Sequence, residues 1–437
     1  DTYMKIKNKI LCLLLLLLLL MISLLVFVNK KESINALVLY RSSIDELAPL
    51  SSDITENTNI KINYKYIFDD TKSNFSTSNL WKDIELFLAD ESNLRDIDVL
   101  FDIPYEYLSY LIKDNKLVDL TNKIDKSTLD NTYYPIIDIS KKAGGGNIYF
   151  LSPTYSTQFI AIDKEFMQLN NSLFVTWNDI YERVEEEEGS SIISYGPGGI
   201  MGISTDLEIL LMSMSPDFIE NGDIYGDKEL VGELKKLISL YKNYGYKKNY
   251  SEELEGISNL NRNERALLKV IYPPQLEDLS IEKNAYYNIL PLPVFEGFED
   301  IVNIRLGMSY SVLESSKKQE ASLKILSYIM SKEFSEKIIS QELYFPNGEF
   351  ASYIDDDIKE LYNQRYNLSN TDFIYAGNSG ALNKNQFTQN EYRAFHTVNG
   401  EILPLIIDNK INIDDGIEEI KSEFKKVVKI LETENKN

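Results

Sequence analysis

Strand-like and helix-like patterns alternate in the first part of the chain. Residues 36–40 form a short apolar run, and residues 60–68 carry apolar or aromatic side chains at every second position, which is typical of strands. A helical pattern fits residues 44–54 between them, and another fits residues 81–89, before the apolar run at 97–101. Strands and helices in this order predict a parallel sheet with crossover helices, and therefore an α/β fold.

The length of the chain indicates more than one hydrophobic core. The chain has 437 residues, which is more than a single core usually organises, so we expect two domain-sized units. Later helices are predicted where apolar residues recur three and four positions apart, at residues 230–241, 320–330 and 417–431.

The charge and the rare residue types exclude several kinds of site. The chain has 68 acidic and 45 basic residues and a formal charge of −23, which repels a phosphate backbone and argues against nucleic acid as a partner. Its single cysteine, Cys12, excludes a disulfide framework and a thiolate metal site. Its single histidine, His396, excludes a multi-histidine metal site. We therefore expect no metal and no cofactor.

The N-terminus carries the strongest local signal. Lys5, Lys7 and Lys9 precede an apolar stretch at residues 10–28 that only Ser23 interrupts. As a helix this stretch is about 28 Å long, roughly the hydrocarbon thickness of a bilayer. The lysines at the short end predict that this end stays in the cytoplasm and that the rest of the chain is exported.

Residues 1–33 are therefore expected to be a signal or anchor segment. No small-x-small cleavage pattern follows the apolar stretch, so an uncleaved transmembrane helix is favoured, and secretion after cleavage is the alternative. Cys12 lies near the start of the apolar stretch, whereas a lipid anchor needs a cysteine just after its end. We expect membrane contact through this helix alone.

Beyond the anchor, a series of short motifs resembles one protein family. These motifs are a strand that ends at a ligand loop, helix exits, crossover strands and closing helices. They lie at residues 96–101, 111–121, 146–153, 176–180, 263–267, 290–293, 307–315 and 405–420. In this order they resemble the extracellular solute-binding proteins of sugar-type ABC importers, which are related to the maltodextrin-binding proteins.

This resemblance implies a two-lobed, periplasmic-binding-protein-like fold of class II, preceded by the N-terminal transmembrane or signal helix. The chain is expected to cross between the lobes three times, near residues 148–153, 289–294 and 344–351, and to leave a cleft between them. The first lobe then consists of residues 34–150 and 289–346, and the second lobe of residues 151–288 and 347–437.

Polar residues in the loops after the strands form the predicted site. Ligands of open parallel sheets bind beyond the carboxyl ends of the strands. Aromatic rings there can cover the apolar faces of a sugar, while charged groups hydrogen-bond to its hydroxyls. The predicted ligand-binding residues are Arg41, Ser42, Asp102, Tyr105, Tyr155, Gln158, Tyr272, Gln275 and Arg305.

Each of these residues also has a structural interpretation. The chain contains 29 tyrosines, and a tyrosine at a strand end usually packs in the core or on the surface. Asp102 is equally well placed to cap a following helix. Arg305 has many acidic residues with which it can form a surface ion pair.

The resemblance implies binding without catalysis. The expected function is capture of a small solute, a mono- or oligosaccharide, for delivery to the permease subunits of an ABC importer. A membrane-anchored sensor that signals to a partner is the alternative, and a glycosidase that uses two carboxylates is a remote one. No serine has a nucleophile-elbow sequence around it, so we expect no enzyme activity.

Overall fold

The structure is a computed structural model of the chain. It describes residues 32–72, 80–164, 167, 175–185, 193–195, 219–220, 223–224, 228–244, 268–271, 273, 276, 287–294, 301–302, 304–343, 349–368, 371–375, 381–382 and 389–434. The predicted anchor at residues 10–28 lies outside these ranges. Within them, no helix combines the length and apolar character needed to cross a bilayer.

The first lobe is built on a four-stranded sheet in the order β13-β3-β1-β2. Strands β1, β2 and β3 are parallel, and β13 pairs antiparallel with β3. The predicted α/β fold is therefore confirmed in this lobe, and its fourth strand comes from a distant part of the chain. The strands are β1 (Glu32–Tyr40), β2 (Ile60–Phe68), β3 (Val99–Phe101) and β13 (Tyr310–Val312).

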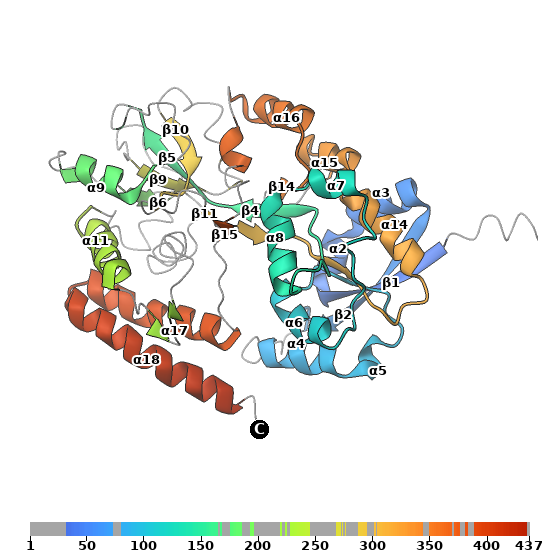
Figure 1. The fold of residues 1–437 in the computed structure, drawn as a ribbon, viewed down its shortest axis with the longest axis horizontal. Helices are drawn as coiled ribbons and strands as arrows, with labels where there is room; N and C mark the ends of the chain where they lie inside the picture. Colours follow the sequence, from blue (N-terminus) through green and yellow to red (C-terminus); the bar gives the residue numbers. More distant parts are fainter. Residues whose placement is uncertain are drawn as a thin grey trace, which may run out of the picture.

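Helices pack on this sheet and connect its strands (Figure 1). Leu50 and Ile54 of α3 are buried, as the apolar spacing of the segment requires. The helix predicted over 44–54 is two helices, because Pro49 stands in the first turn of α3 and starts a new helix there. The helices of this lobe are α2 (Ser42–Glu46), α3 (Ala48–Thr58), α4 (Leu80–Ala89), α5 (Glu91–Leu94), η1 (Tyr105–Leu108), α6 (Ser109–Lys113), α7 (Lys126–Asp130), α8 (Tyr134–Ala143), α14 (Gln319–Ile329) and α15 (Lys332–Ile339).

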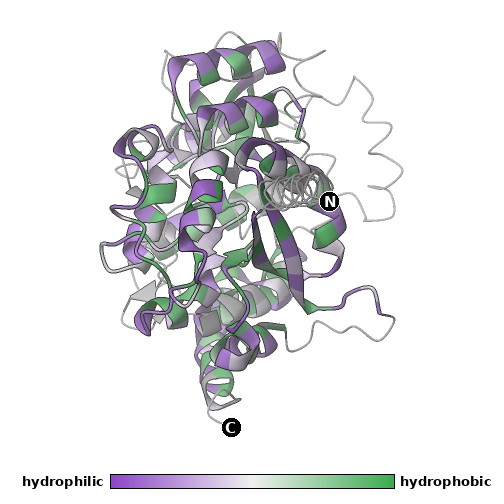
Figure 2. Cartoon of the chain, turned by 90° about the vertical axis from the view of Figure 1, so that its right-hand side faces the viewer, coloured by the Kyte–Doolittle hydropathy of each residue, from purple (hydrophilic) through white to green (hydrophobic). Residues whose placement is uncertain are grey.

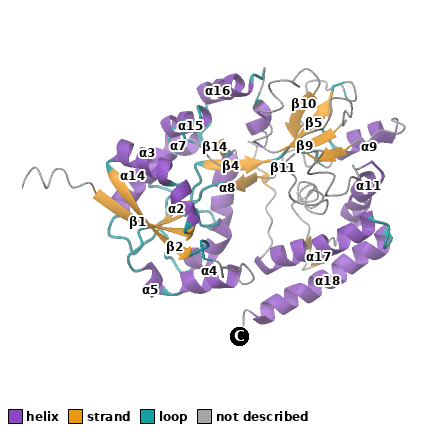
Figure 3. Ribbon diagram, turned by 180° about the vertical axis from the view of Figure 1, so that it is seen from behind, coloured by secondary structure: helices purple, strands orange, loops and turns teal. Residues whose placement is uncertain are grey.

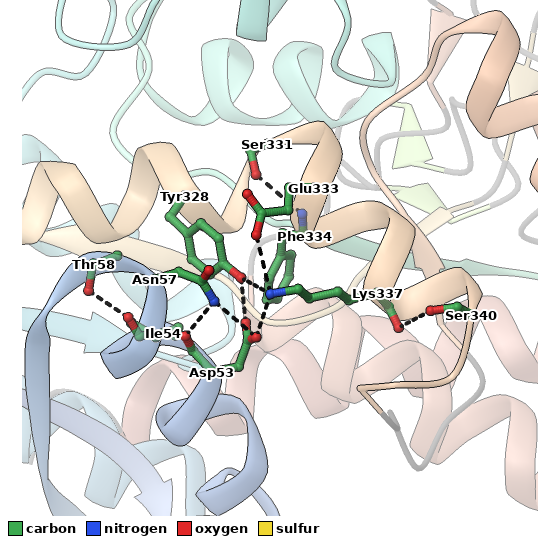
Figure 4. A network of polar contacts seen from close by, with 10 residues as sticks. All are labelled: Asp53, Ile54, Asn57, Thr58, Tyr328, Ser331, Glu333, Phe334, Lys337 and Ser340. Carbon is green, nitrogen blue, oxygen red and sulfur yellow. Dashed lines mark hydrogen bonds and ion pairs between the residues drawn. The ribbon is translucent and has the colours of Figure 1, made fainter.

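A polar network joins α3 to α14 and α15 (Figure 4). The Lys337 ammonium lies 2.7 Å from Asp53 Oδ1 and 2.9 Å from the Tyr328 hydroxyl oxygen. The Tyr328 hydroxyl donates a hydrogen bond of 2.6 Å to Asp53 Oδ2. Each of the three side chains is therefore bonded to both of the others, so the network connects all three helices.

The second lobe has its own four-stranded sheet, in the order β10-β5-β9-β6. Its core also takes in the apolar faces of α17 and α18 from the end of the chain, which pack against each other beside α11 (Figures 1 and 3). The strands are β5 (Phe159–Asp163), β6 (Ile193–Tyr195), β9 (Leu268–Ile271) and β10 (Tyr287–Pro291), and the helices are α9 (Trp177–Glu185), α11 (Lys228–Tyr244), α17 (Gln389–Ile407) and α18 (Ile413–Glu434).

Buried apolar residues form two clusters: one fills the first lobe and extends to Phe159, Ala161 and Tyr287 of the second-lobe sheet, and the other lies wholly in the second lobe. Helices in the side view carry both hydrophilic and hydrophobic residues (Figure 2), as amphipathic helices on a core require. Two short strand pairs are also present: the hairpin of β7 (Ile219–Glu220) with β8 (Asp223–Ile224), and β11 (Ile301–Val302) with β15 (Ala381–Leu382). The prediction of two domain-sized units is confirmed.

A three-stranded sheet connects the lobes, and we call it the crossing sheet. It consists of β4 (Thr154–Thr157), β12 (Ile304–Leu306) and β14 (Phe350–Ala351), and β4 pairs antiparallel with both of the others. Figure 1 places β4 and β14 between the two lobes. Three crossings are therefore present.

Two of the predicted crossing positions need correction. The first crossing strand is β4, which follows the predicted segment 148–153 directly. The second was predicted at 289–294, but β10 pairs with β5 inside the second lobe, and β12 is the strand that returns. From sequence alone, an apolar strand with prolines that crosses between the lobes cannot be distinguished from one that remains within a lobe. The third prediction, 344–351, contains β14.

The predicted lobe boundaries change accordingly. Residues 347–437 were assigned wholly to the second lobe, but α16 (Asp356–Tyr366) packs on α15 of the first lobe, whereas η3 (Asp372–Tyr375) lies against β10 of the second lobe. Residues 289–294 belong to the second lobe. Glu32 and Ser33 are part of β1, so the predicted segment 1–33 extends two residues too far.

Candidate functional site

The carboxyl ends of three parallel strands place charged residues along one edge of the first-lobe sheet. Asp102 follows β3, and Arg41 follows its neighbour β1. Asp69 and Asp70 follow β2 on the other side of β1. This is the edge at which open parallel sheets bind ligands.

Arg41 and Ser42 bind the acidic residues that follow β2. The Arg41 guanidinium lies 3.3 Å from Asp69 Oδ2, and Ser42 donates from its backbone N–H, 3.0 Å, and from its hydroxyl to the Asp70 carboxylate. The Ser42 bonds lower the pKa of Asp70. Arg41 and Ser42 thus join the ends of two strands in this structure, and their predicted contact with solute stays a prediction.

Asp102 has an unusual backbone and a carboxylate without a hydrogen-bond partner among the described residues. Its φ is +57°, in the left-handed region that aspartate tolerates better than most residues. Its N–H donates to the Ser309 carbonyl at 2.8 Å, which fixes it beside the segment between β12 and β13. The residue before η1 is Pro104, so Asp102 does not cap that helix.

The surroundings of Asp102 disfavour its negative charge. Asp102 is partly buried, and this burial raises the pKa of its carboxyl to about 7, with the charges of Glu349 and Glu46 acting in the same direction. Arg305 partly offsets them. The carboxyl of Asp102 therefore takes up a proton at a much higher pH than an ordinary aspartate does.

Asp102 belongs to a group of charges at the junction of the lobes, which we call the junction cluster. Arg305 is exposed on β12, Glu46 lies on α2, and Glu106 lies on η1. Glu106 reaches solvent, yet the surrounding protein raises the pKa of its carboxyl, and Arg305 partly offsets this effect. The members of the junction cluster are Glu46, Asp102, Glu106, Arg305 and Glu349.

Glu349 enters the junction cluster from the residue before β14. The Thr154 hydroxyl of β4 donates to Glu349 Oε2. Gly307 lies directly against this carboxylate. A Cβ added to Gly307 would be 2.8 Å from Glu349 Cδ and closer still to the Thr154 hydroxyl oxygen. The Gly307 N–H also donates to the Thr154 carbonyl at 2.9 Å. Glycine at 307 is what allows the carboxylate to lie against the crossing sheet.

Tyr155, predicted to stack on a sugar, is a packing residue in this structure. It has no exposed surface, its ring centroid is 4.6 Å from that of Tyr133, and its hydroxyl donates to the Ile374 carbonyl at 2.8 Å. The rings of Tyr133 and Phe350 pack on it, and together with the η3 backbone they bury the side chain. We therefore leave Tyr155 out of the site.

The other predicted residues have mixed outcomes. Tyr105 is half-buried beside the junction cluster and stacks on Phe150, with ring centroids 5.4 Å apart. Gln158 is half-buried between β4 and β5. Tyr272 and Gln275 lie outside the described residues.

Sequence reasoning missed Glu46, Glu106 and Glu349. Glu349 had a detectable signal, since it is a carboxylate inside the predicted third crossing at 344–351. Glu106 directly follows the predicted Tyr105. Within the described ranges, no group of three or more His, Cys, Asp and Glu residues is arranged to hold a metal ion, the junction carboxylates included.

Comparisons by sequence identify no relative of this chain. No protein-family model matches it, and no curated protein does. Solved structures with the same fold are nevertheless numerous.

Three of these structures illustrate the likeness. A sugar transporter from Rhizobium etli, in an open conformation, is 14% identical, with a TM-score of 0.59 over 90% of this chain and 99% of that chain. A cyclic alpha-maltosyl-1,6-maltose binding protein from Arthrobacter globiformis is 10% identical, with a TM-score of 0.62 over 92% and 100%. Maltose-bound MalE3 of T. maritima is 15% identical, with a TM-score of 0.56 over 90% and 99%.

The chain therefore has the two-lobed fold of the sugar-binding proteins of ABC importers, along nearly the whole length of each. The resemblance predicted from the sequence motifs is confirmed for the fold.

Proposed function

We propose that the protein binds a small solute, a carbohydrate, between its lobes and delivers it unchanged to the permease subunits of an ABC importer. The observation that carries this proposal is the junction cluster. Strands and helices from distant parts of the chain bring its charged groups to the carboxyl edge of the first-lobe sheet, next to the crossing sheet. The similar structures named above include proteins described as binding maltose and a cyclic maltosyl sugar.

The crossing sheet supports a closing motion around the solute. Its three strands are two to four residues long, so small changes in their backbone angles rotate one lobe against the other. A solute that contacts both lobes stabilises the closed arrangement by the difference in its affinity for the two states. Release to a permease then requires reopening.

We further propose that residues 1–31 tether the protein to the extracytoplasmic face of the cell membrane. The apolar stretch at 10–28 and the three preceding lysines support this placement. Membrane fractionation and N-terminal sequencing of the mature protein test it. A soluble protein that begins between Val28 and Leu37 would contradict the tether and leave the binding function intact.

Calorimetry with the purified full-length chain tests the binding function. Mono- and oligosaccharides are titrated, with amino acids and short peptides as controls, and small-angle scattering follows the radius of gyration. We expect a carbohydrate to bind and the radius of gyration to decrease. Binding of peptides alone would reject the proposed solute class, and sugar cleavage during the titration would reject transport without catalysis.

A further inference from the structure

The two faces of the crossing sheet differ in polarity. Tyr155 of β4 pairs with Leu306 of β12 and with Phe350 of β14, and directly paired residues of antiparallel strands point to the same face. All three side chains are buried. Ser156 and Arg305, which pair with each other, point to the opposite face because successive residues of a strand alternate. One face is therefore apolar, and the other carries the guanidinium of the junction cluster.

The helices α16 and η3 pack over the apolar face. The Tyr155 hydroxyl donates a hydrogen bond of 2.8 Å to the Ile374 carbonyl of η3. The Tyr362 hydroxyl of α16 accepts a hydrogen bond of 2.7 Å from the Ala351 N–H of β14. The rings of Tyr362 and Phe350 lie edge to face, with centroids 5.7 Å apart. Both helices are thus bonded directly to strands of the crossing sheet.

Both ends of α16 are attached to α15 of the first lobe. At its start, the Lys332 ammonium lies 2.8 Å from Oδ2 of Asp355, the residue that caps α16. Near its end, the Arg365 guanidinium donates to the Ile339 carbonyl at 3.3 Å, at the last residue of α15. Basic side chains often bond the carbonyls at the end of a helix in this way. The first lobe therefore holds α16 in place.

The contacts of η3 reach the second lobe. The Phe373 ring lies edge to face against the Phe159 ring of β5, with centroids 5.0 Å apart, and η3 packs on β10, the neighbour of β5. Thr371, just before η3, donates from its hydroxyl to Asn363 Oδ1 of α16 at 2.8 Å. Figures 1 and 3 show α16 above the crossing sheet, on the side away from α17 and α18. A continuous set of contacts therefore runs from α15 through α16 and η3 to the second-lobe sheet.

We infer that α16 and η3 form a strap that holds the second lobe against the first across the apolar face of the crossing sheet, so that the lobes separate at the polar face alone. Separation on the strap side exposes aromatic rings to water, which costs free energy. Charged groups at the polar face remain solvated when the lobes part there. The inference rests on the closing motion of the proposed function, and it adds the side of the molecule on which that motion opens a cleft.

Distances between pairs of spin labels test the strap on the full-length chain in detergent, without any solute. One pair, Glu360→Cys and Lys164→Cys, joins α16 to the end of β5. The other pair, Leu86→Cys and Ile430→Cys, joins α4 to α18, on the side away from α16 (Figures 1 and 3). All four side chains are exposed, and Cys12→Ser removes the natural cysteine. We expect a narrow distance distribution for the first pair and a broader one for the second.

Two substitutions weaken the attachment of the strap to the second lobe. Phe373→Ala removes the ring that contacts Phe159, so it should broaden the first distribution and lengthen the mean distance of the second pair by several ångströms. Phe373→Leu keeps most of the apolar contact, and it should change both distributions in the same direction by a smaller amount. The leucine variant also keeps the test decisive if the alanine variant does not fold.

Phe334→Ala is the matched control. Phe334 is also a fully buried phenylalanine in an edge-to-face contact, but its partner is Tyr328 and both lie within the first lobe. Its removal should destabilise the protein, as removal of any buried ring does, and should leave both distance distributions unchanged. Urea denaturation of each variant measures the stability that the two sites have in common. The distances measure what the strap alone contributes.

The outcomes separate the strap from the proposed function. Distributions in the folded Phe373 variants that match the unsubstituted protein would overturn the strap. Shorter distances would overturn it too, because they would show that η3 keeps the lobes apart. Equal broadening in Phe334→Ala would assign the effect to a general loss of stability and likewise reject the inference. Failure of every carbohydrate to bind would reject the proposed function and leave these distances unaffected, because they are measured without solute.

Discussion

The two edges of the crossing sheet differ in what surrounds them. On the β14 edge, Phe350 is fully buried among aromatic rings, and the Ala351 N–H donates to the Tyr362 hydroxyl at 2.7 Å. On the β12 edge, Arg305 is exposed and Gly307 lies against a carboxylate. One edge is thus held by apolar packing, and the other presents charge at the junction of the lobes. Stability and recognition are separated across three short strands.

The largest effect is expected from opening the aromatic edge. Phe350→Ala should lower the free energy of unfolding by about 3–5 kcal/mol, because it removes a buried ring and leaves a cavity. Urea denaturation measures the change. Leu86→Ala, at a side chain that is 60% exposed, is the control and should have little effect. A loss below about 1 kcal/mol for Phe350→Ala would contradict the packing role of this edge.

A smaller effect is expected from adding one carbon to the charged edge. Gly307→Ala should cost about 1–3 kcal/mol, since the new methyl group displaces Glu349 or Thr154. Gly232→Ala in α11 is the matched control, because nothing lies within 4 Å of its added carbon and alanine favours a helix. Thermal unfolding of both variants measures the contrast. Equal behaviour of the two would show that the carboxylate moves away freely.

The charged edge also makes stability depend on pH. The pKa of Asp102 is raised from 3.8 to about 7 in the folded protein, mainly by burial. The folded state therefore binds an extra proton as pH falls, and stability should increase by at most about 1.4 kcal/mol between pH 8 and pH 6. Asp102→Asn should flatten this part of the profile in urea titrations. An unchanged profile in the variant would assign the effect to another group.

The smallest effect is expected far from either edge. Lys337→Gln should cost about 1 kcal/mol, because it weakens the bonds to Asp53 and Tyr328 but leaves both side chains partly solvated. Solute affinity should stay within a factor of two of the unsubstituted protein, as measured by calorimetry. A large change in affinity would show that the α3–α15 contact also controls the junction.

The sequence predicted the individual strands better than it predicted which strands pair with each other. Residues 60–68 form β2 over the whole predicted range, because alternation on a half-buried strand marks both its face and its length. The segment 289–294 was assigned to a crossing, since an apolar strand bounded by prolines does not reveal which strand it pairs with. Its partner, β5, is more than a hundred residues earlier in the chain.

The site was predicted in part for the same reason. Asp102 was predicted because it follows the apolar run 97–101, which the sequence identifies as a strand, whereas Arg305 was predicted as a loop residue and lies inside β12. Glu46 and Glu349 join them only through tertiary contacts. Tyr155 was misassigned because Tyr133, Phe350 and Ile374, which bury its ring, are distant in the sequence and meet it only in the folded protein.

The origin of β13 has a consequence for the nascent chain. Phe101 of β3 pairs with Tyr310 of β13, 209 residues further along. At about 5–20 residues per second, a ribosome needs roughly 10–40 s to add that stretch. During this interval an apolar strand edge stays open, and such edges readily pair with other chains. The protein is therefore most exposed to aggregation while it is being made, before its fourth strand exists.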